Sequence, residues 1–423
     1  MKKLSLICFV LTLSLQIHAQ ESANYGAPKF APEDGKKLLI IGQDLGAVGG
    51  LNSHSNGYVD NNSSHIPGGV TSYTSLPSLN GLTSLSNWGS GDVRAQSYLE
   101  DATFDNSAIV IGLYLVDALS GVANGSFDYA IKDFAVWVKG QNRPVFIRIG
   151  YEFEGSWNNY NPSQYIAAWK HIVHVFDAEG VRNASYVWQS AGLNYNNIEN
   201  WYPGDEYVNW VGYSNFDGAN MGLSIRNFAD ERGKPVMIAE ATPRRDLKVG
   251  SGEGHWSTWY EPLFSRIYGN DRIKALAYIN VNWDAQSMWV GQGWGDSRVE
   301  VNDFVQTAWN NEIQKEVWLT ANNSLFDELN YSEWIATNID TPVMERGLTV
   351  KVSQNYLEVS HPNQGLLQGI SIWDFSGRLL LKEEEAQKTY RISLQNTTMV
   401  GVILSVFTNE NQWIRKKIMV PSN

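Results

Sequence analysis

The chain has 423 residues, a formal net charge of −12, 43% hydrophobic and 18% charged residues. This charge argues against nucleic acid or an anionic membrane as a partner. The length exceeds one average domain but suits an α/β barrel with a small appendage.

The first residues predict export. Met1-Lys2-Lys3 precedes an apolar run from Leu4 to Leu15, a pattern typical of a signal peptide, here residues 1–19. The run is too short for a stable membrane anchor, and no later segment reaches its length, so we expect no membrane span. The single cysteine, Cys8, lies in this leader. The mature chain is therefore expected to have no disulfide and no thiolate metal site.

Strand-like and helix-like segments then alternate along most of the chain. Eight apolar segments predict strands, and they start at Lys37, Val70, Ser107, Pro144, Ala184, Val208, Pro235 and Ala275. Segments with helical spacing follow several of them, at 127–140, 161–180, 220–233, 256–269 and 299–317. This alternation predicts parallel strands with right-handed crossovers, and eight such strands close a (β/α)₈ TIM barrel over residues 36–330.

The pattern changes after residue 330. Residues 331–345, with Thr341-Pro342, predict a linker. Residues 346–423 contain short alternating segments and no helix period, at 348–352, 356–359, 369–373, 378–381, 390–394, 401–407 and 414–420. These segments predict a small all-β sandwich.

Two glutamates end predicted strands, Glu152 on the fourth and Glu240 on the seventh. Active sites of α/β barrels form at the C-terminal strand ends, and two carboxyls facing a sugar are what glycoside hydrolysis requires. One protonated carboxyl donates to the leaving oxygen, while the ionised one attacks the anomeric carbon or activates water. We expect the separation of roughly 5 to 5.5 Å typical of retaining enzymes. The alternative is a structural ion pair with Arg148 or Arg244.

Three stretches carry a resemblance to a known family: Glu152 followed by Gly155 and Trp157, residues 201–212 with a Tyr-Pro-Gly-Asp block, and residues 234–240. Over roughly residues 35–329 the chain resembles the family-26 glycoside hydrolases. That family comprises retaining (β/α)₈ enzymes, including β-mannanases, β-1,3-xylanases and some mixed-linkage glucanases. The resemblance implies Glu152 as acid/base and Glu240 as nucleophile, with Trp157 and Trp283 as walls for the sugars.

The chain also departs from the mannanase-type pattern. Tyr151 stands where those members have His before the acid/base, and Glu154 stands where they have Asn. They also have a Tyr near the end of strand six that hydrogen-bonds the nucleophile, whereas Phe216 stands here, with Tyr213 as the nearby substitute. Because both glutamates remain, these departures affect the specificity for mannan and not the catalytic pair. β-1,3-Xylan therefore becomes a competing substrate.

Other residues are candidates for substrate binding. The 17 Trp and 20 Tyr predict a large aromatic core with a minority of rings lining a cleft. Trp283 either forms the floor of the site or packs at the barrel rim, and Gln43 and Asp44 either bind sugar hydroxyls or serve the structure. The remaining candidates are Tyr151, Arg148, Tyr213 and Trp201, with Trp256, Trp289 and Trp294 as extensions of the cleft.

The sequence predicts no metal and no cofactor. His171 and His174 lie three apart on a predicted helix, a spacing that suits a metal. No further ligand accompanies them, so a surface pair is favoured. No phosphate-binding loop, dinucleotide fingerprint or zinc motif occurs.

The last domain carries Asp374-Phe375-Ser376-Gly377-Arg378 and the basic residues Arg415-Lys416-Lys417. These features are similar to the C-terminal sorting domains of the type IX secretion system in Bacteroidetes. The resemblance implies secretion machinery as a partner and a secreted or cell-surface location. The alternative is a carbohydrate-binding module that uses Trp373 and Trp413.

Together these features predict a secreted, retaining endo-β-glycanase that acts on a plant or algal polysaccharide, with β-mannan or β-1,3-xylan as the substrate. The alternative from another class is a non-catalytic glycan-binding protein on the same barrel. A binder has no need of a second carboxylate, which favours the enzyme. A metal-dependent hydrolase lacks clustered His and Asp ligands.

Overall fold

The computed structural model describes residues 26–62, 65–194, 196–216, 221–332, 349–352, 356–360, 367–373, 379–393, 401–408 and 413–419. It divides into two compact units, one up to Leu325 and one from Phe326 onward. The predicted leader, residues 333–348 with the greater part of the predicted linker, and residues 374–378 of the sorting-type motif lie outside the described residues.

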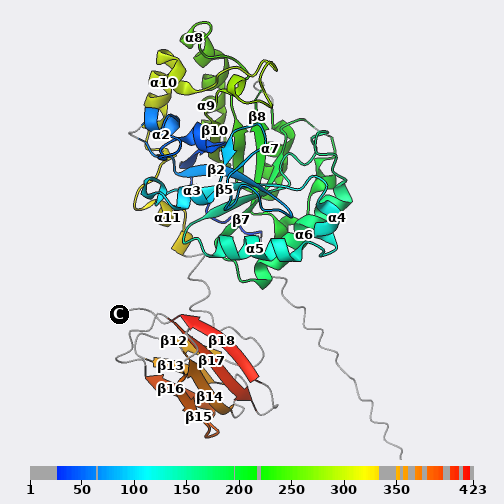
Figure 1. The fold of residues 1–423 in the computed structure, drawn as a ribbon, viewed down its shortest axis with the longest axis vertical. Helices are drawn as coiled ribbons and strands as arrows, with labels where there is room; N and C mark the ends of the chain where they lie inside the picture. The colour runs from blue at the N-terminus through cyan, green and yellow to red at the C-terminus, as the bar shows by residue number, and fades with distance from the viewer. Residues whose placement is uncertain are drawn as a thin grey trace, which may run out of the picture. The chain divides into compact units, whose positions relative to one another are not determined.

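Eight parallel strands form the first unit and close into a barrel (Figure 1). They are β1 (Lys37–Gly42), β2 (Gly69–Ser75), β5 (Ala108–Tyr114), β6 (Val145–Ile149), β7 (Ala184–Ser190), β8 (Trp210–Asn215), β9 (Val236–Ala241) and β10 (Ile273–Ile279). Closure is direct, because β1 pairs in parallel with both β2 and β10. A short strand, β11 (Trp318–Leu319), adds to β1, and a hairpin of β3 (Ser86–Asn87) and β4 (Asp92–Val93) follows β2. The predicted TIM barrel is confirmed.

Helices follow most of the barrel strands. They are α1 (Leu45–Val48), α2 (Tyr58–Asn61), α3 (Gln96–Leu99), α4 (Leu119–Ala123), α5 (Asp128–Lys139), α6 (Pro162–Ala178), α7 (Leu223–Arg232), α8 (Gly252–His255), α9 (Glu261–Tyr268), α10 (Asp303–Ile313) and α11 (Leu325–Glu328). A π-helical turn at Trp256–Tyr260 leads into α9. Short 3₁₀ turns lie at Ala102–Phe104, Ile198–Trp201, Asp205–Tyr207, Trp283–Ala285 and Val299–Val301.

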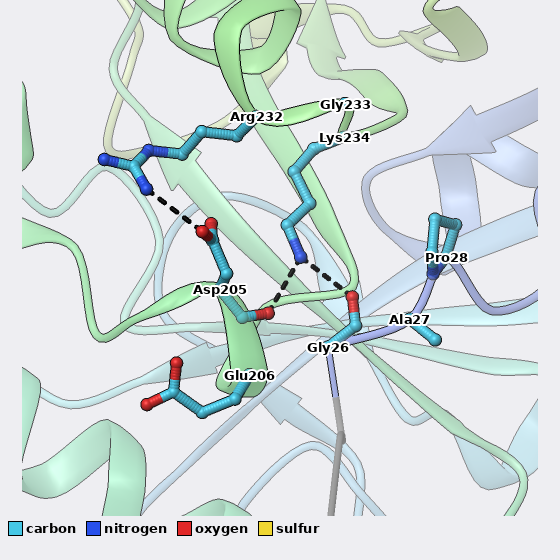
Figure 2. Close-up of a pocket in the computed structure, with 8 residues that line it drawn as sticks. All are labelled: Gly26, Ala27, Pro28, Asp205, Glu206, Arg232, Gly233 and Lys234. Atoms are coloured by element: carbon cyan, nitrogen blue, oxygen red, sulfur yellow. Dashed lines mark hydrogen bonds and ion pairs between the residues drawn. The ribbon is translucent and has the colours of Figure 1, made fainter.

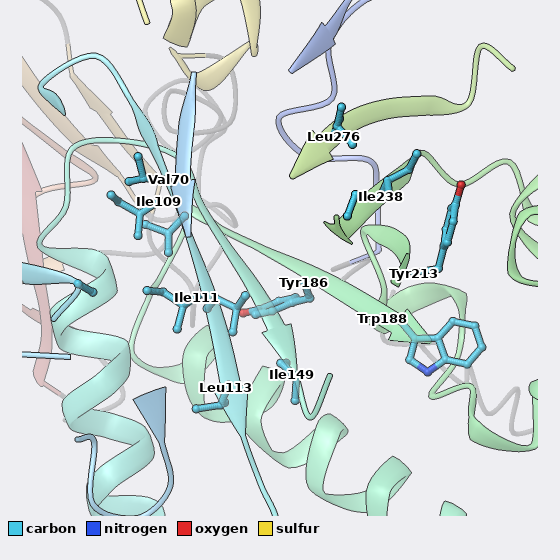
Figure 3. Packing of buried hydrophobic residues seen from close by; sticks show 14 of the residues in the cluster. Val70, Ile109, Ile111, Leu113, Ile149, Tyr186, Trp188, Tyr213, Ile238 and Leu276 are labelled. Carbon is cyan, nitrogen blue, oxygen red and sulfur yellow. The ribbon is translucent and has the colours of Figure 1, made fainter. Parts of the chain in front are cut away.

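The main core lies between the barrel and its helices. Figure 3 shows some of its side chains, among them Val70 of β2 beside Ile109 of the neighbouring strand β5. Helix α6 begins where the sequence predicts it, since the Asn161 carboxamide caps the backbone N–H groups of Ser163 and Gln164 and proline occupies its first turn. The aliphatic and phenylalanine side chains that such helices bury stabilise the fold by roughly 1.5 to 3 kcal/mol each.

The N-terminal segment lies across the N-terminal ends of the strands. Phe30 is fully buried against Phe146, and the Trp210 indole Nε1 donates to the Lys29 carbonyl at 2.7 Å. The Lys234 ammonium, just before β9, donates to three backbone carbonyls, those of Gly26, Asp205 and Val208, at 2.6 to 2.8 Å. A pocket of about 510 Å³ lies beside this ammonium (Figure 2). The segment therefore seals this end of the barrel.

The second unit contains two antiparallel sheets. One orders β12 (Thr349–Val352), β13 (Tyr356–Ser360) and β16 (Thr389–Ser393), and the other orders β15 (Leu379–Glu383), β14 (Leu367–Trp373), β17 (Gly401–Thr408) and β18 (Trp413–Met419). One hydrophobic cluster joins Leu357 and Tyr390 of the first sheet to Ile370 and Val406 of the second. The sheets therefore pack face to face, as predicted for a sandwich.

One detail differs from the sequence prediction. The last barrel strand ends at Ile279, so Trp283 lies in a 3₁₀ turn beyond it and not at the strand end. The reason is that Asn282 pairs with Asp296 and the Trp283 N–H donates to the Gly295 carbonyl, which folds the following loop back. Within the described ranges, no helix combines the length and apolar character needed to cross a membrane.

Candidate active site

A buried ion pair lies at the C-terminal end of the barrel. Arg148 on β6 is completely buried, and its Nη1 donates to Glu240 Oε1 at 2.5 Å. Glu240 on β9 is 7% exposed. Glu240 Oε1 also accepts from the Tyr73 hydroxyl at 3.1 Å, whereas Oε2 accepts no hydrogen bond from the described residues.

The second carboxyl, that of Glu152, follows β6 in the left-handed backbone region, at φ 55°. Its Oε1 accepts from the Ser214 hydroxyl at 2.6 Å and its Oε2 from the Trp157 indole Nε1 at 3.1 Å. Burial, followed by the negative charge of Glu240, raises the pKa of Glu152 to about 8. Glu152 is therefore protonated near neutral pH although Glu240 is bound to an arginine.

A hydrogen-bond chain through the barrel interior joins the two carboxyls. Arg148 Nη1, besides binding Glu240, donates to Gln189 Oε1 at 3.0 Å. Gln189 Nε2 donates to Ser214 Oγ at 3.1 Å, and Ser214 contacts Glu152. Gln189 on β7 and Ser214 on β8 are both fully buried. Four neighbouring strands, β6 to β9, thus contribute to one network.

Two tyrosine rings enclose the guanidinium of Arg148. Its Cζ lies 4.9 Å from the centre of the Tyr73 ring and 5.2 Å from that of Tyr151, and the two rings meet edge to face at 5.4 Å. Gly112 permits this packing, because a Cβ there would lie 2.4 Å from Tyr73 and 2.8 Å from Arg148. Burial raises the pKa of Tyr73, which keeps its hydroxyl protonated as a donor to Glu240.

An exposed indole lies beside Glu152. Trp157 is 59% exposed and lies over Gly155, where a Cβ would meet the ring at 2.4 Å. The flat face of such an indole can pack against the apolar face of a pyranose. Glu154, in contrast to Trp157, is buried. Its carboxylate accepts hydrogen bonds from the Ser190 hydroxyl and from the Ala191 N–H. It anchors the loop after β6 to the end of β7.

Comparisons with known proteins agree with this geometry. The model of glycosyl hydrolase family 26 matches residues 87–238, a range that includes Glu152 and ends two residues before Glu240. A β-1,3-xylanase from a Vibrio species is 29% identical over 367 residues, which cover 78% of this chain and 75% of the relative. A β-1,3-xylanase from an Alcaligenes species is 28% identical, with 78% and 74% covered. The chain is a glycoside hydrolase.

Among solved structures, a modular endo-β-1,4-mannanase from Cellulomonas fimi superimposes on this hydrolase with a TM-score of 0.52 and 15% identity, covering 95% of this chain and 100% of that one. At this identity the likeness concerns the fold. The family model and the two relatives show where this chain is similar to family 26 in sequence.

Other candidate residues of the hydrolase lie apart from the carboxyl pair. Trp283 is 2% exposed, donates from Nε1 to Ser297 Oγ and packs against Trp289 and Trp294, so its faces are covered by protein. Tyr213 is buried outside the barrel, with its ring close to Gly222 and the charges of Arg226 and Arg266 nearby. Tyr73 from β2, and not Tyr213, is the tyrosine that contacts Glu240.

Four further candidates have structural partners. Gln43 donates to the Ser90 carbonyl at 3.3 Å. Asp44 is 2% exposed, and its Oδ1 caps α1 by accepting from the N–H groups of Gly46 and Ala47; burial raises its pKa to about 6. Trp201 packs behind Phe153, at 5.6 Å between ring centres, and supports the loop that carries Glu152. Trp256 stacks on Tyr260 at 5.2 Å, next to the helix layer.

The two histidines have separate partners. His171 Nε2 lies 2.6 Å from an Asp128 carboxylate oxygen, and His174 Nε2 lies 3.1 Å from the Tyr207 hydroxyl. In the part of the chain that the structure describes, no group of three or more His, Cys, Asp or Glu residues is arranged to hold a metal ion.

The sequence interpretation missed Tyr73, Gln189 and Ser214. A signal was present, because each is a polar residue within the last three positions of a barrel strand, as Arg148 and Glu240 are near the ends of theirs. What the sequence lacks is the inward or outward direction of each side chain. The arrangement as a whole offers one protonated carboxyl and one arginine-bound carboxylate at the barrel mouth, the pair that acid-assisted nucleophilic displacement at a sugar needs.

Proposed function

We propose that the chain is a retaining endo-β-glycanase that hydrolyses β-1,3-xylan, with Glu152 as acid/base and Glu240 as nucleophile. The observation that carries this proposal is the contrast between the two carboxyl environments. Arg148 and Tyr73 both donate to Glu240, whereas burial and the charge of Glu240 raise the pKa of Glu152 to about 8. Two carboxyl groups held in such different environments can divide the roles of acid and nucleophile between them.

In the first step Glu240 Oε2 attacks the anomeric carbon. This oxygen is the free one, because Arg148 and Tyr73 bind Oε1. The glycosidic C–O bond breaks as Glu152 donates its proton to the leaving oxygen, and a glycosyl ester forms on Glu240.

In the second step Glu152, now ionised, takes a proton from water while the water oxygen attacks the anomeric carbon and Glu240 leaves. The Ser214 hydroxyl and the Trp157 indole both donate to Glu152, and hydrogen bonds to a carboxylate stabilise its charged form. These two hydrogen bonds therefore also stabilise Glu152 as the base after it has given up its proton.

The choice of β-1,3-xylan rests on the two relatives described as β-1,3-xylanases, each aligned over 78% of this chain. Tyr151, Glu154 and Phe216 stand where mannanase-type members of the family have other residues. β-Mannan is the second candidate, because the similar solved structure is that of a mannanase. Trp157 supplies an exposed aromatic wall for the sugar next to the acid.

The test is product release from β-1,3-xylan, β-1,4-xylan, β-1,4-mannan and mixed-linkage glucan by the wild type, Glu240→Ala and Glu152→Ala. We expect oligosaccharides from β-1,3-xylan with the wild type and a loss of at least ~10⁴-fold in Glu240→Ala. Glu154→Gln is the matched control, because it changes a carboxyl two residues from Glu152 that contacts β7 instead. We expect it to stay within about threefold of the wild type.

Two outcomes contradict the proposal. Activity that survives in Glu240→Ala excludes this glutamate as the nucleophile. A wild type that binds β-1,3-xylan without releasing product from any of the four glycans excludes the catalytic assignment in favour of a glycan-binding protein.

We also propose that the chain is exported and that residues 346–423 address it to the type IX secretion machinery. The leader pattern of residues 1–19 and the sequence similarity of residues 374–378 and 415–417 support this. In a bacterium that has this system, we expect the full chain in the medium or on the cell surface and a chain without residues 346–423 in the periplasm. Equal export of both chains excludes the sorting role.

A further inference from the structure

Two buried residues outside the catalytic pair connect its members. Gln189 and Ser214 are fully buried, and both lie in the only described hydrogen-bond path that runs from Arg148 to Glu152. Completely buried polar side chains cost free energy unless their hydrogen bonds are satisfied, so a linked set in a barrel interior needs a reason.

The direction of each bond in this path follows from its first member. A guanidinium can only donate, so Arg148 Nη1 must meet the carbonyl oxygen of the Gln189 side chain. This contact turns the Gln189 amide nitrogen toward Ser214, where it donates to Oγ. The side-chain amide is therefore held in one of its two orientations.

The orientation of the Gln189 amide in turn fixes the orientation of the Ser214 hydroxyl. Its oxygen already accepts from Gln189, and its single hydroxyl proton must point to the remaining neighbour, Glu152 Oε1, at 2.6 Å. An oxygen that accepts this proton at such a distance cannot carry the carboxyl proton in the same direction. The proton of Glu152 is thereby assigned to Oε2, which accepts only the longer contact from the indole Nε1 of the exposed Trp157, at 3.1 Å.

We propose that Gln189 and Ser214 are positioning residues that fix the catalytic proton on Glu152 Oε2, the oxygen that contacts the exposed Trp157. The inference rests on the proposed function and adds to it the cause of the proton's location. The guanidinium of Arg148 orients both the nucleophile and the acid. It binds Oε1 of Glu240 directly, which leaves Oε2 of Glu240 for the attack on the sugar. Through Gln189 and Ser214 it also fixes Oε1 of Glu152, which leaves Oε2 of Glu152 to carry the proton.

This role has a signature that a merely structural role lacks. Proton donation matters for a leaving sugar, whose oxygen is strongly basic, and matters little for a dinitrophenolate, which leaves without a proton. A misplaced acid proton should therefore slow the cleavage of an oligosaccharide and spare the first step on a dinitrophenyl glycoside. General weakening of the fold should affect both substrates equally.

The experiment measures kcat/KM of the full chain on β-1,3-xylotetraose and on 2,4-dinitrophenyl β-1,3-xylobioside. We expect Ser214→Ala and Gln189→Met to lower it about 10- to 30-fold on the tetraose, a part of the ~10²- to 10⁴-fold that general acid catalysis supplies, and less than about twofold on the aryl glycoside. Ser214→Thr retains the hydroxyl and should recover most of the loss, and thermal unfolding of each variant verifies that it is folded.

Glu152→Ala separates the two levels of the proposal. Suppose that Glu152→Ala loses more kcat/KM on the tetraose than on the aryl glycoside. If Ser214→Ala and Gln189→Met then lose kcat/KM equally on both substrates, or on neither, the positioning role is wrong while Glu152 remains the acid. If Glu152→Ala itself shows no difference between the substrates, Glu152 is not the acid and both proposals fail.

Discussion

The two ends of β9 hold a buried charge in opposite ways. At its start, Lys234 donates to three backbone carbonyls, and no carboxylate contacts its ammonium among the described residues. Near its end, about 20 Å along the strand, Glu240 is bound by Arg148 and Tyr73 and keeps one oxygen free. Saturated contacts stabilise a fold, whereas an unsatisfied group at a cleft is available for chemistry. The start of β9, where the contacts of Lys234 are saturated, is called the sealed end below. The other end, where Glu240 keeps one oxygen available, is called the reactive end.

Among the residues that hold the two carboxyls in place, the largest expected effect comes from removing Arg148. Arg148→Met leaves Glu240 charged and buried without its partner, a defect of roughly 3 to 5 kcal/mol, and frees the Gln189 side chain. We expect kcat/KM on the preferred glycan to fall about 10³-fold.

Lys234→Met is the matched control at the sealed end. It leaves three carbonyls without their donor, so we expect a loss of about 2 kcal/mol of unfolding free energy and a Tm lower by roughly 4 to 8 °C, with kcat/KM at 25 °C close to that of the wild type. Similar activity losses in both variants would remove the distinction between the two ends.

A smaller effect is expected from Tyr73→Phe. The change removes one of the two donors to Glu240 Oε1 and preserves the ring that covers Arg148. We expect kcat to fall about 10-fold with little change in KM, because a hydrogen bond to a charged group contributes about 1.5 kcal/mol. Steady-state kinetics with Tyr213→Phe as control tests this, since Tyr213 lies in the helix layer. A Tyr213→Phe variant that loses more activity than Tyr73→Phe contradicts the assignment.

The smallest effect concerns pH. In the proposed mechanism Glu152 is the acid and its pKa is about 8, so kcat/KM should fall above pH 8 as this proton is lost. Its pKa is raised above the ordinary value of 4.5, so the fold favours the neutral carboxyl. This stabilisation is complete below pH 4.5 and is lost as pH rises toward 8, since the unfolded chain ionises first.

Thermal unfolding tests the same carboxyl without activity. Glu152→Gln stays neutral at every pH, so its Tm should exceed that of the wild type by a few °C at pH 8.5 and by less at pH 4.5. A Tm difference that is the same at both pH values indicates an ordinary pKa for Glu152.

The sequence predicts the barrel because its apolar runs and helical segments alternate, and the (β/α)₈ closure and the sandwich are confirmed. It also points to Glu152, Glu240 and Arg148, because a charge at the end of an apolar strand is a strong local signal. These three residues meet at one end of the barrel, as parallel strands require.

The other contacts depend on the direction of side chains, which the sequence does not reveal. Residues 210–215 read Trp-Val-Gly-Tyr-Ser-Asn, a mixture in which neither face stands out as apolar. Only the register with β7 and β9 decides that Ser214 points inward and Tyr213 outward. Trp283 is buried for a similar reason, because the loop that folds over it is fixed by backbone bonds of Asn282 and Gly295. Tyr73 lies on a strand whose polar residues give a weak pattern.

The most direct test of the central claim is the identity of the residue that becomes glycosylated. A 2,4-dinitrophenyl 2-deoxy-2-fluoro-β-1,3-xylobioside should inactivate the wild-type chain by forming a slow ester, and peptide mapping should place one label on Glu240. Time-dependent inactivation with the label on Glu240 is the predicted result. A label on any other residue, or turnover that proceeds with inversion at the anomeric carbon and leaves no label, contradicts the assignment of Glu240 as nucleophile.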